Sequence, residues 1–290
     1  MSLINLKGRT ALVTGVADNV GFGWHIAKAL ANASAEIILS THPRVVSILE
    51  RFLTNKKYAE SRRLLDGTEF RPKLVIPCDV AVDTMDGLLD EERSEKGYQS
   101  DISIAGMVKT LKASGQEKID ILIHSVAFSP EITTLHMDVS RKAYLTAMSV
   151  SSYSLVALCR AVLPFMAGRS GSIIALSFLA AERAVPFYGG GMASAKAALE
   201  CDARMLSWQL GEDGHRINII SAGPYASRAA KAIGDMDAMI NLVKGKSPLR
   251  RPITAEDVAN AALFLASDLS SAITGETIHV DAGFHAVALV

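Results

Sequence analysis

A tyrosine and a lysine, Tyr188 and Lys196, lie eight residues apart with three consecutive glycines between them. A phenol can donate a hydrogen bond to a reacting oxygen, and an ammonium group can supply positive charge beside it. In one continuous helix, eight residues span about 12 Å, which is far for two side chains that must meet one bound molecule. Because glycine disfavours helix, we expect Tyr188 on an irregular turn and a helix that begins near Met192. A core tyrosine and a surface lysine would show the same residues, so the pair alone does not decide.

A glycine-rich segment follows the first apolar run of the chain. Gly15, Gly21 and Gly23 lie between residues 10–14 and a segment with helical spacing. Small residues let a backbone approach a pyrophosphate, and a helix N-terminus offers free N–H groups and a positive dipole. The spacing differs from GxGxxG, so a plain tight turn remains the alternative to a dinucleotide site.

Polar residues follow the next two apolar runs. The second run ends in His42-Pro43-Arg44, without the acidic residue that commonly holds a ribose 2′-hydroxyl. Arg44 could receive a 2′-phosphate, which would indicate NADP, whereas His42 could border an adenine. Asp79, after the third run, could accept a hydrogen bond from the adenine amino group or simply occupy a surface turn. These residues leave the choice of nucleotide open.

Alternating strand and helix patterns position these residues. Short apolar runs predict seven strands, and longer segments with helical spacing separate them. This order predicts a single-domain α/β fold, a Rossmann-like doubly wound parallel sheet with helices on both faces. Thr254, three residues before Asp257, predicts the cap of the last helix. Residues 43–72 and 81–118 are interpreted as insertions, each with helical segments. The predicted strands are 9–14, 36–41, 73–77, 119–125, 172–177, 216–221 and 277–280, and the main helices are 23–33, 104–111, 141–166, 192–211 and 255–265.

Composition argues against several classes of protein. The 290 residues include 30 basic and 30 acidic side chains and are 49% hydrophobic, which is too apolar for a disordered chain. A zero net charge without a basic stripe argues against nucleic-acid binding. No uninterrupted apolar run reaches the length of about 18 residues that a membrane helix needs. Three widely spaced cysteines fit reduced thiols, and no metal site is expected. Because the first strand begins almost at once, we expect a cytoplasmic protein without a targeting segment.

The segment around Tyr188 and Lys196 resembles a known family. It runs from Leu176 through Ala181-Glu182-Arg183 and Pro186 to the tyrosine, the glycines and the lysine. This pattern is similar to that of the enoyl-acyl-carrier-protein reductases, a divergent branch of the short-chain dehydrogenase/reductase superfamily. The triple glycine, the long insertions and residues 227–232 resemble the plastid-type subgroup. Further similar segments span nearly the whole chain, at residues 151–154, 221–224, 254–258 and 279–283.

The resemblance implies NADH-dependent reduction of the trans-2 double bond of enoyl thioesters on acyl carrier protein, the last step of the fatty acid elongation cycle. Tyr188 would donate a hydrogen bond to the enolate oxygen, and Lys196 would hold the nicotinamide ribose. Substrate contacts are expected at Ser129, Phe178 and Tyr188. A lid over residues 225–240 and a homotetramer built on helices 141–166 and 192–211 are also implied. Cofactor contacts are expected at Gly15, Gly21, Phe22, His42, Asp79, Val80, Ser125, Val126, Lys196, Tyr225, Ala226, Ser227, Arg228 and Ala229.

One position departs from the family pattern. Many members carry a second tyrosine where this chain has Phe178, which cannot donate to an oxyanion, so we assign it to the pocket wall. Two other functions fit the fold: a catalytically inactive nucleotide-binding regulator, and a 3-oxoacyl thioester reductase. The latter enzymes normally place their tyrosine and lysine four residues apart. Candidate basic residues for the acidic carrier protein, each equally explained as solvated surface, are Arg183, Arg228, Lys231, Lys244 and Lys246.

Overall fold

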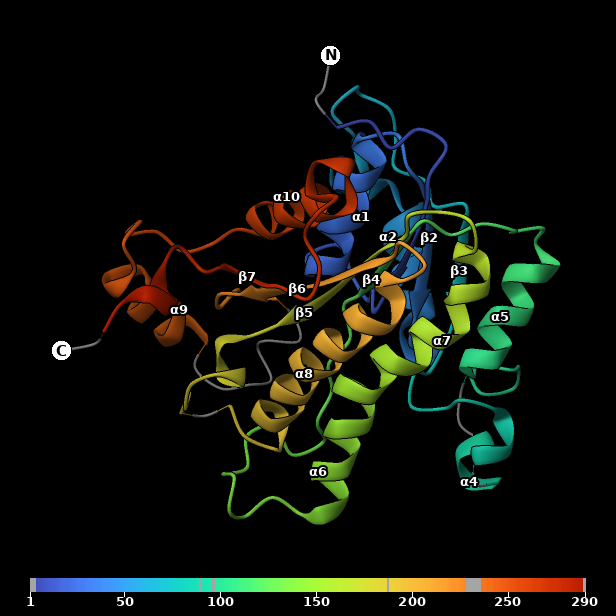
Figure 1. Ribbon diagram of the computed structural model, residues 1–290. Helices are drawn as coiled ribbons and strands as arrows, with labels where there is room; N and C mark the ends of the chain where they lie inside the picture. The colour runs from blue at the N-terminus through green and yellow to red at the C-terminus, as the bar shows by residue number, and fades with distance from the viewer. Residues whose placement is uncertain (1–3, 89, 95–96, 187, 228–235, 289–290) are drawn as a thin grey trace.

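Seven parallel strands form one sheet in the order β3-β2-β1-β4-β5-β6-β7 (Figure 1). The computed structural model describes residues 4–88, 90–94, 97–186, 188–227 and 236–288. The predicted strands are confirmed, with ends that shift by at most two residues. The strands are β1 (Thr10–Thr14), β2 (Glu36–Thr41), β3 (Leu74–Pro77), β4 (Ile121–His124), β5 (Ser172–Ser177), β6 (Arg216–Ala222) and β7 (Thr277–Val280).

The strand order reverses between β1 and β4. These two strands pair in the sheet although β2 and β3 lie between them in the sequence. At such a point the connecting segments leave the strand ends in opposite directions and open a crevice. Thr14 pairs in register with His124, so the glycine loop after β1 meets the segment after β4 at this crevice.

Helices cover both faces of the sheet because successive strand residues point to opposite sides. On one side, α1 (Phe22–Asn32) and α10 (Ala255–Ala266) pack over a core that includes Val13. On the other side, α5 (Ile104–Ala113), α7 (Ser154–Met166) and α8 (Met192–Gly211) pack over a core that includes Leu12 (Figure 1). The predicted doubly wound fold is confirmed.

Residues Arg141–Met166 form one 26-residue helix. It consists of α6 (Arg141–Met148), a π-helical turn (Ser149–Tyr153) and α7. By length and composition alone this helix could cross a membrane, but 56% of its most apolar window is buried inside the protein. Core helices of water-soluble proteins commonly meet the same test. The π turn, which sequence periodicity does not indicate, lies close to the β1–β4 crevice and is of a kind often found at functional sites.

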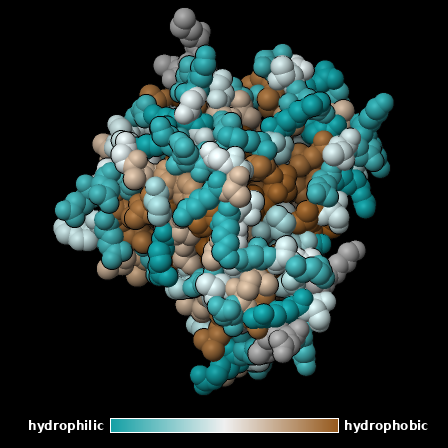
Figure 2. Space-filling model, turned by 90° about the vertical axis from the view of Figure 1, so that its right-hand side faces the viewer, coloured by the Kyte–Doolittle hydropathy of each residue, from teal (hydrophilic) through white to brown (hydrophobic). Residues whose placement is uncertain are grey.

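Both insertions contain helices, as expected. The first forms α2 (Val46–Thr54) and α3 (Ala59–Arg62), and the second forms α4 (Asp90–Arg93) before α5. Buried Arg62 stabilises the first insertion by donating hydrogen bonds to the Phe52 carbonyl and to Glu69, both at 2.6 Å. Helix α9 (Met236–Lys246) precedes α10, whose predicted cap is confirmed as a capping box. Figure 2 shows that hydrophilic side chains cover most of the face on the right of Figure 1, around a band of hydrophobic ones.

Candidate active site

A cavity of about 860 Å³ lies at the carboxyl ends of the strands, around the β1–β4 crevice. This volume lies in the range of small-molecule and cofactor sites. Segments after β1 to β6 contribute to its wall, together with α1 and α8. Most residues implied by the resemblance line it, namely Gly15, Gly21, Phe22, His42, Asp79, Val80, Ser125, Val126, Phe178, Tyr188, Lys196, Tyr225 and Ser227.

The glycine loop brings backbone close to the cavity. Gly15 has φ +75°, and a Cβ at this position would lie 2.1 Å from the Ser125 carbonyl oxygen. A larger residue therefore cannot fit without moving the segment after β4. The buried Asp18 carboxylate shapes the loop, since it accepts hydrogen bonds from the backbone N–H groups of Val20 at 3.0 Å and Gly21 at 2.8 Å. Helix α1 then begins beside the cavity with no side-chain cap at its N-terminus, which is a favourable place for an anion.

Three side chains form a hydrogen-bonded cluster at one end of the cavity, which we call the Asp79 end (His42, Asp79 and Tyr98). The Tyr98 hydroxyl donates to Asp79 Oδ2 at 2.5 Å and lies 3.2 Å from His42 Nε2. His42 Nε2 lies 3.4 Å from the same carboxylate oxygen. Burial by itself would raise the pKa of Asp79, but hydrogen bonds from His42, Tyr98 and the Ala81 backbone lower it to about 2. Asp79 is therefore a fixed negative charge.

The turn after Tyr188 sets the geometry of the opposite end. Gly190 and Gly191 have φ of +59° and +79°, and α8 begins at Met192. Lys196 consequently lies in the second turn of α8, and both predictions for this segment are confirmed. The irregular turn lets Tyr188 and Lys196 line the same cavity despite their separation in sequence.

Burial dominates the chemistry of this region, the Lys196 end (Tyr188, Lys196 and Glu200). Lys196 is 4% exposed, and its Nζ donates to the Leu176 carbonyl at 2.7 Å. Burial lowers the pKa of Lys196 to about 8, against an opposing contribution from Glu200. Burial also raises the pKa of Tyr188, whose ring centroid lies 4.9 Å from that of Phe178. Tyr188 therefore stays protonated as a hydrogen-bond donor, and Lys196 loses its proton at a much lower pH than an ordinary lysine does.

Four of the residues implied by the resemblance are not placed in the cavity wall. Ser129 is buried and does not line the cavity, and its hydroxyl donates to the Gly190 carbonyl at 2.7 Å and so supports the turn beside Tyr188. Ala226 is described between two lining residues but does not itself line the cavity. Arg228 and Ala229 lie outside the described residues, as do Lys231 and part of the expected lid.

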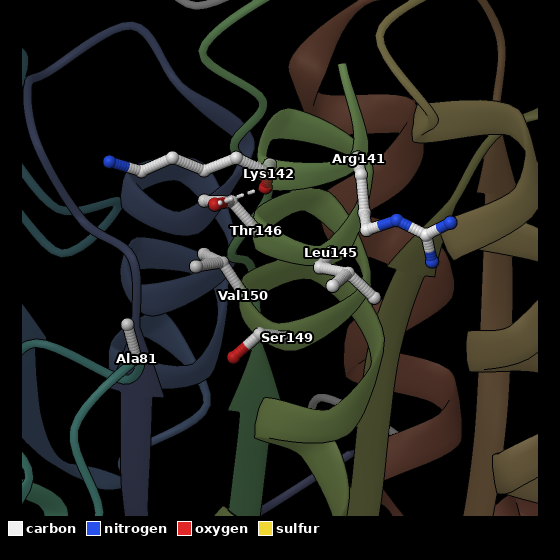
Figure 3. Close-up of a pocket in the computed structure, with 7 residues that line it drawn as sticks. All are labelled: Ala81, Arg141, Lys142, Leu145, Thr146, Ser149 and Val150. Atoms are coloured by element: carbon white, nitrogen blue, oxygen red, sulfur yellow. Dashed lines mark hydrogen bonds between the residues drawn. The ribbon is translucent and has the colours of Figure 1, made fainter. Parts of the chain in front are cut away.

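A second, more open pocket of about 760 Å³ adjoins the Asp79 end and shares Ala81, Thr146 and Val150 with the main cavity. Arg141 and Lys142 lie on its rim but point away from each other, and the Thr146 hydroxyl donates to the Lys142 carbonyl (Figure 3). These two cations do not converge on one ligand. Among the residues that the structure describes, no group of three or more His, Cys, Asp and Glu side chains could hold a metal ion.

Comparison with known proteins identifies the family. A family model described as enoyl-(acyl carrier protein) reductase matches residues 89–285, which is more than half of the chain. The chain belongs to the enoyl-acyl-carrier-protein reductase family. The resemblance inferred from the Tyr188 to Lys196 segment is thus confirmed.

Relatives within this reductase family cover the whole fold. The chloroplastic enoyl-[acyl-carrier-protein] reductase [NADH] 2 of Oryza sativa subsp. japonica is 45% identical, over 99% of this chain and 77% of its own length. A crystal structure of the Plasmodium berghei reductase with triclosan has a TM-score of 0.92 at 37% identity, covering 97% of this chain and 98% of that one. The Anaplasma phagocytophilum reductase in complex with NAD has a TM-score of 0.79 at 35% identity, covering 99% and 97%.

Sequence reasoning missed Tyr98 and Asp18 in the cavity lining, and Glu200 beside it. Tyr98 comes from the second insertion, where an aromatic residue among polar ones was the only available signal. Asp18 lies inside the glycine loop and is recognisable only as an acidic residue three positions before Gly21. Glu200 follows Lys196 by one helical turn, a spacing that places both on one face of α8.

Proposed function

We propose that this protein reduces the trans-2 double bond of enoyl thioesters carried on acyl carrier protein, with NADH as the reductant. The observation that carries the proposal is the set of groups that one cavity brings together. Its Lys196 end presents a half-buried phenol and a buried amine, and the glycine loop presents a helix N-terminus without a side-chain cap. The names of the relatives, which specify NADH, support the cofactor.

The residues of the cavity fit a dinucleotide. Gly15 leaves a cradle that a Cβ would fill, and α1 offers its N-terminus to a pyrophosphate. Thr41 also lines the cavity, and its hydroxyl is buried with no hydrogen-bond partner among the described residues. Because a buried polar atom without a partner is unfavourable, this hydroxyl supports binding of a polar ligand near the Asp79 end.

The chain's own residues stabilise the charge that develops during reduction. NADH supplies the hydride that the β-carbon of the enoyl group receives. Negative charge then moves to the thioester carbonyl oxygen, where Tyr188 donates a hydrogen bond, since its raised pKa keeps it protonated. Lys196 adds positive charge at the same end of the cavity and holds the ribose. Phe178 forms part of the apolar wall beside Tyr188 and donates nothing.

Assembly and location are further parts of the proposal. Large apolar side chains are exposed on the two long helices, with Leu145 on α6 and Met205 and Trp208 on α8, the last 84% exposed. An apolar surface of this kind supports a homotetramer built on these helices.

Met239, on α9, lines the cavity and supports a substrate lid over residues 225–240 of a single catalytic domain. We further propose a cytoplasmic protein that binds neither nucleic acid nor a membrane; relatives named from plants are chloroplastic.

The test is absorbance of reduced nicotinamide during turnover. Purified protein receives crotonyl or a longer enoyl thioester with NADH, and in parallel with NADPH. We expect oxidation of NADH that depends on the thioester, and a loss of kcat of about 10²-fold to 10³-fold in Tyr188→Phe, the size typical for removal of one oxyanion donor.

Two outcomes would favour the competing functions. Tight NADH binding without turnover on any enoyl thioester would indicate a nucleotide-binding regulator. Turnover of a 3-oxoacyl thioester in preference to the enoyl thioester would indicate a carbonyl reductase on the same fold. Retained turnover in Tyr188→Phe would remove Tyr188 from the proposed role, and Tyr144→Phe is the matched control outside the cavity lining.

A further inference from the structure

Glu200 is a buried acidic residue on the same face of α8 as Lys196. It follows Lys196 by one helical turn and is 6% exposed. The Ser177 hydroxyl donates to its Oε1 at 2.5 Å. Ser177 ends β5 and lines the cavity, and the carbonyl of the preceding Leu176 accepts the hydrogen bond from Lys196. Two adjacent residues of β5 therefore fix both side chains of the pair.

Burying a carboxylate at this position carries a desolvation penalty that packing alone does not explain. Burial raises the pKa of Glu200, which shows that its charged form is disfavoured there, and the hydrogen bond from Ser177 offsets this only in part. An apolar residue of similar size would fill the same space without that cost. The carboxylate is turned to Ser177 rather than forming a direct ion pair with Lys196. Its charge therefore acts on the lysine through space while its position is held by β5.

We propose that Glu200, held by Ser177, is a positioning residue that keeps Lys196 charged and directed into the cavity at the pH of the reaction. This inference rests on the proposed reductase function. Burial lowers the pKa of Lys196 to about 8, and the negative charge of Glu200 opposes this lowering. Without Glu200, a larger fraction of Lys196 would lose its proton as pH rises, and the ribose would lose a charged partner.

The other groups around the pair do not replace Glu200. On β4, His124 is fully buried with its pKa lowered to about 3, so it is neutral. The groups that face Glu200 are Glu182, which opposes its ionisation, and His279 and Arg204, which favour it. His279 Nε2 lies 3.0 Å from Glu182, which draws the histidine towards that carboxylate. Within the described part of the chain, Glu200 is the acidic group that raises the pKa of Lys196.

The experiment is the pH profile of kcat/KM for NADH oxidation by the full chain, with wild type, Glu200→Gln and Glu200→Asp. We expect Glu200→Gln to stay within about threefold of wild type at pH 6.5. Its alkaline limb should move about one unit lower, so that activity at pH 9 falls about tenfold further than in wild type. Glu200→Asp keeps the charge and should restore most of the limb. Glu182→Gln, on a half-exposed carboxylate that faces Glu200 from the other side, should move it little.

Two results would overturn this role. An alkaline limb that stays in place in Glu200→Gln would show that its charge does not reach Lys196. A loss of activity by the same factor at every pH would show a structural role only. If Glu200→Gln does not fold, the same limb is compared between wild type and Ser177→Ala, which frees the carboxylate, and an unmoved limb there would also reject the proposal. Failure of the proposed function is distinct, since wild type would then not oxidise NADH at any pH, and the pH dependence of NADH binding by fluorescence would report Lys196 instead.

Discussion

The two ends of the cavity treat their ionisable groups in opposite ways. At the Asp79 end, hydrogen bonds from Tyr98 and His42 outweigh burial and hold the carboxylate charged, with a pKa of about 2. At the Lys196 end, burial outweighs the available partners and moves Tyr188, Lys196 and Glu200 towards their neutral forms. A fixed charge suits recognition of a ligand. Groups whose burial favours their uncharged forms suit a reaction that develops charge and consumes a proton.

The largest predicted effect is on folding stability and concerns His124. Burial favours the neutral form of this histidine, as it does for the groups of the Lys196 end. The Ser154 hydroxyl donates to the Val150 carbonyl at 2.7 Å, so it must accept the hydrogen bond from His124 Nε2 at 2.7 Å. Burial, helped by Lys196, lowers the pKa of His124 to about 3. In this pH range the unfolded state therefore binds a proton at His124 that the folded state does not bind. The free energy of unfolding decreases by about 1.4 kcal/mol for each pH unit as pH falls from about 6.5 to 3.

Chemical denaturation at a series of pH values measures this effect. His124→Gln keeps a donor for Ser154 and cannot titrate, so its stability should fall less between pH 6 and pH 4 than that of wild type. His136→Gln, at an exposed histidine, is the control and should follow wild type. Identical pH dependence in His124→Gln and wild type would contradict the assignment. Asp79 could account for a loss of folding stability only at lower pH, because its stabilising charge is lost as pH falls from about 3.8 through about 2.

The next effect concerns the Asp79 end. Tyr98→Phe removes the hydroxyl that bonds both His42 and Asp79, so the carboxylate loses its short hydrogen bond. We expect NADH to bind about threefold to tenfold more weakly, the range for the net contribution of one ordinary hydrogen bond, with kcat nearly unchanged. Fluorescence titration measures the Kd. Tyr153→Phe removes a similar bond to Asp83 on the surface and should not change it. A fall in kcat instead of affinity would contradict the assignment of ligand binding to the Asp79 end and of the reaction to the Lys196 end.

The smallest effect concerns Phe178. Phe178→Tyr adds a hydroxyl to the cavity wall next to Tyr188. Because Tyr188 already supplies a donor, we expect kcat to change by less than about fivefold in this variant. In the Tyr188→Phe background the same change should recover part of the lost rate. No recovery in the double variant would show that position 178 does not reach the reacting oxygen.

Sequence alone predicted most of the fold and much of the site. The strands are continuous apolar runs, so their positions follow from local composition, and α8 begins at Met192 because three glycines precede it. The cap of α10 depends only on Thr254 and Asp257, three residues apart. The contact of Tyr98 with His42 joins residues 56 positions apart, and no local pattern marks it. Ser129 was expected at the substrate, but the structure places its hydroxyl on the Gly190 carbonyl.

The parallel sheet, the glycine loop and the unusual separation of Tyr188 and Lys196 follow from local sequence, because each depends on neighbouring residues in the chain. Which ionisable groups are charged depends instead on the packed fold. The pKa of a side chain depends on its burial and on partners supplied by distant segments, as the insertion supplies Tyr98 to Asp79 and β5 supplies Ser177 to Glu200. Local sequence does not encode that burial, because it arises only when separate elements pack around one cavity.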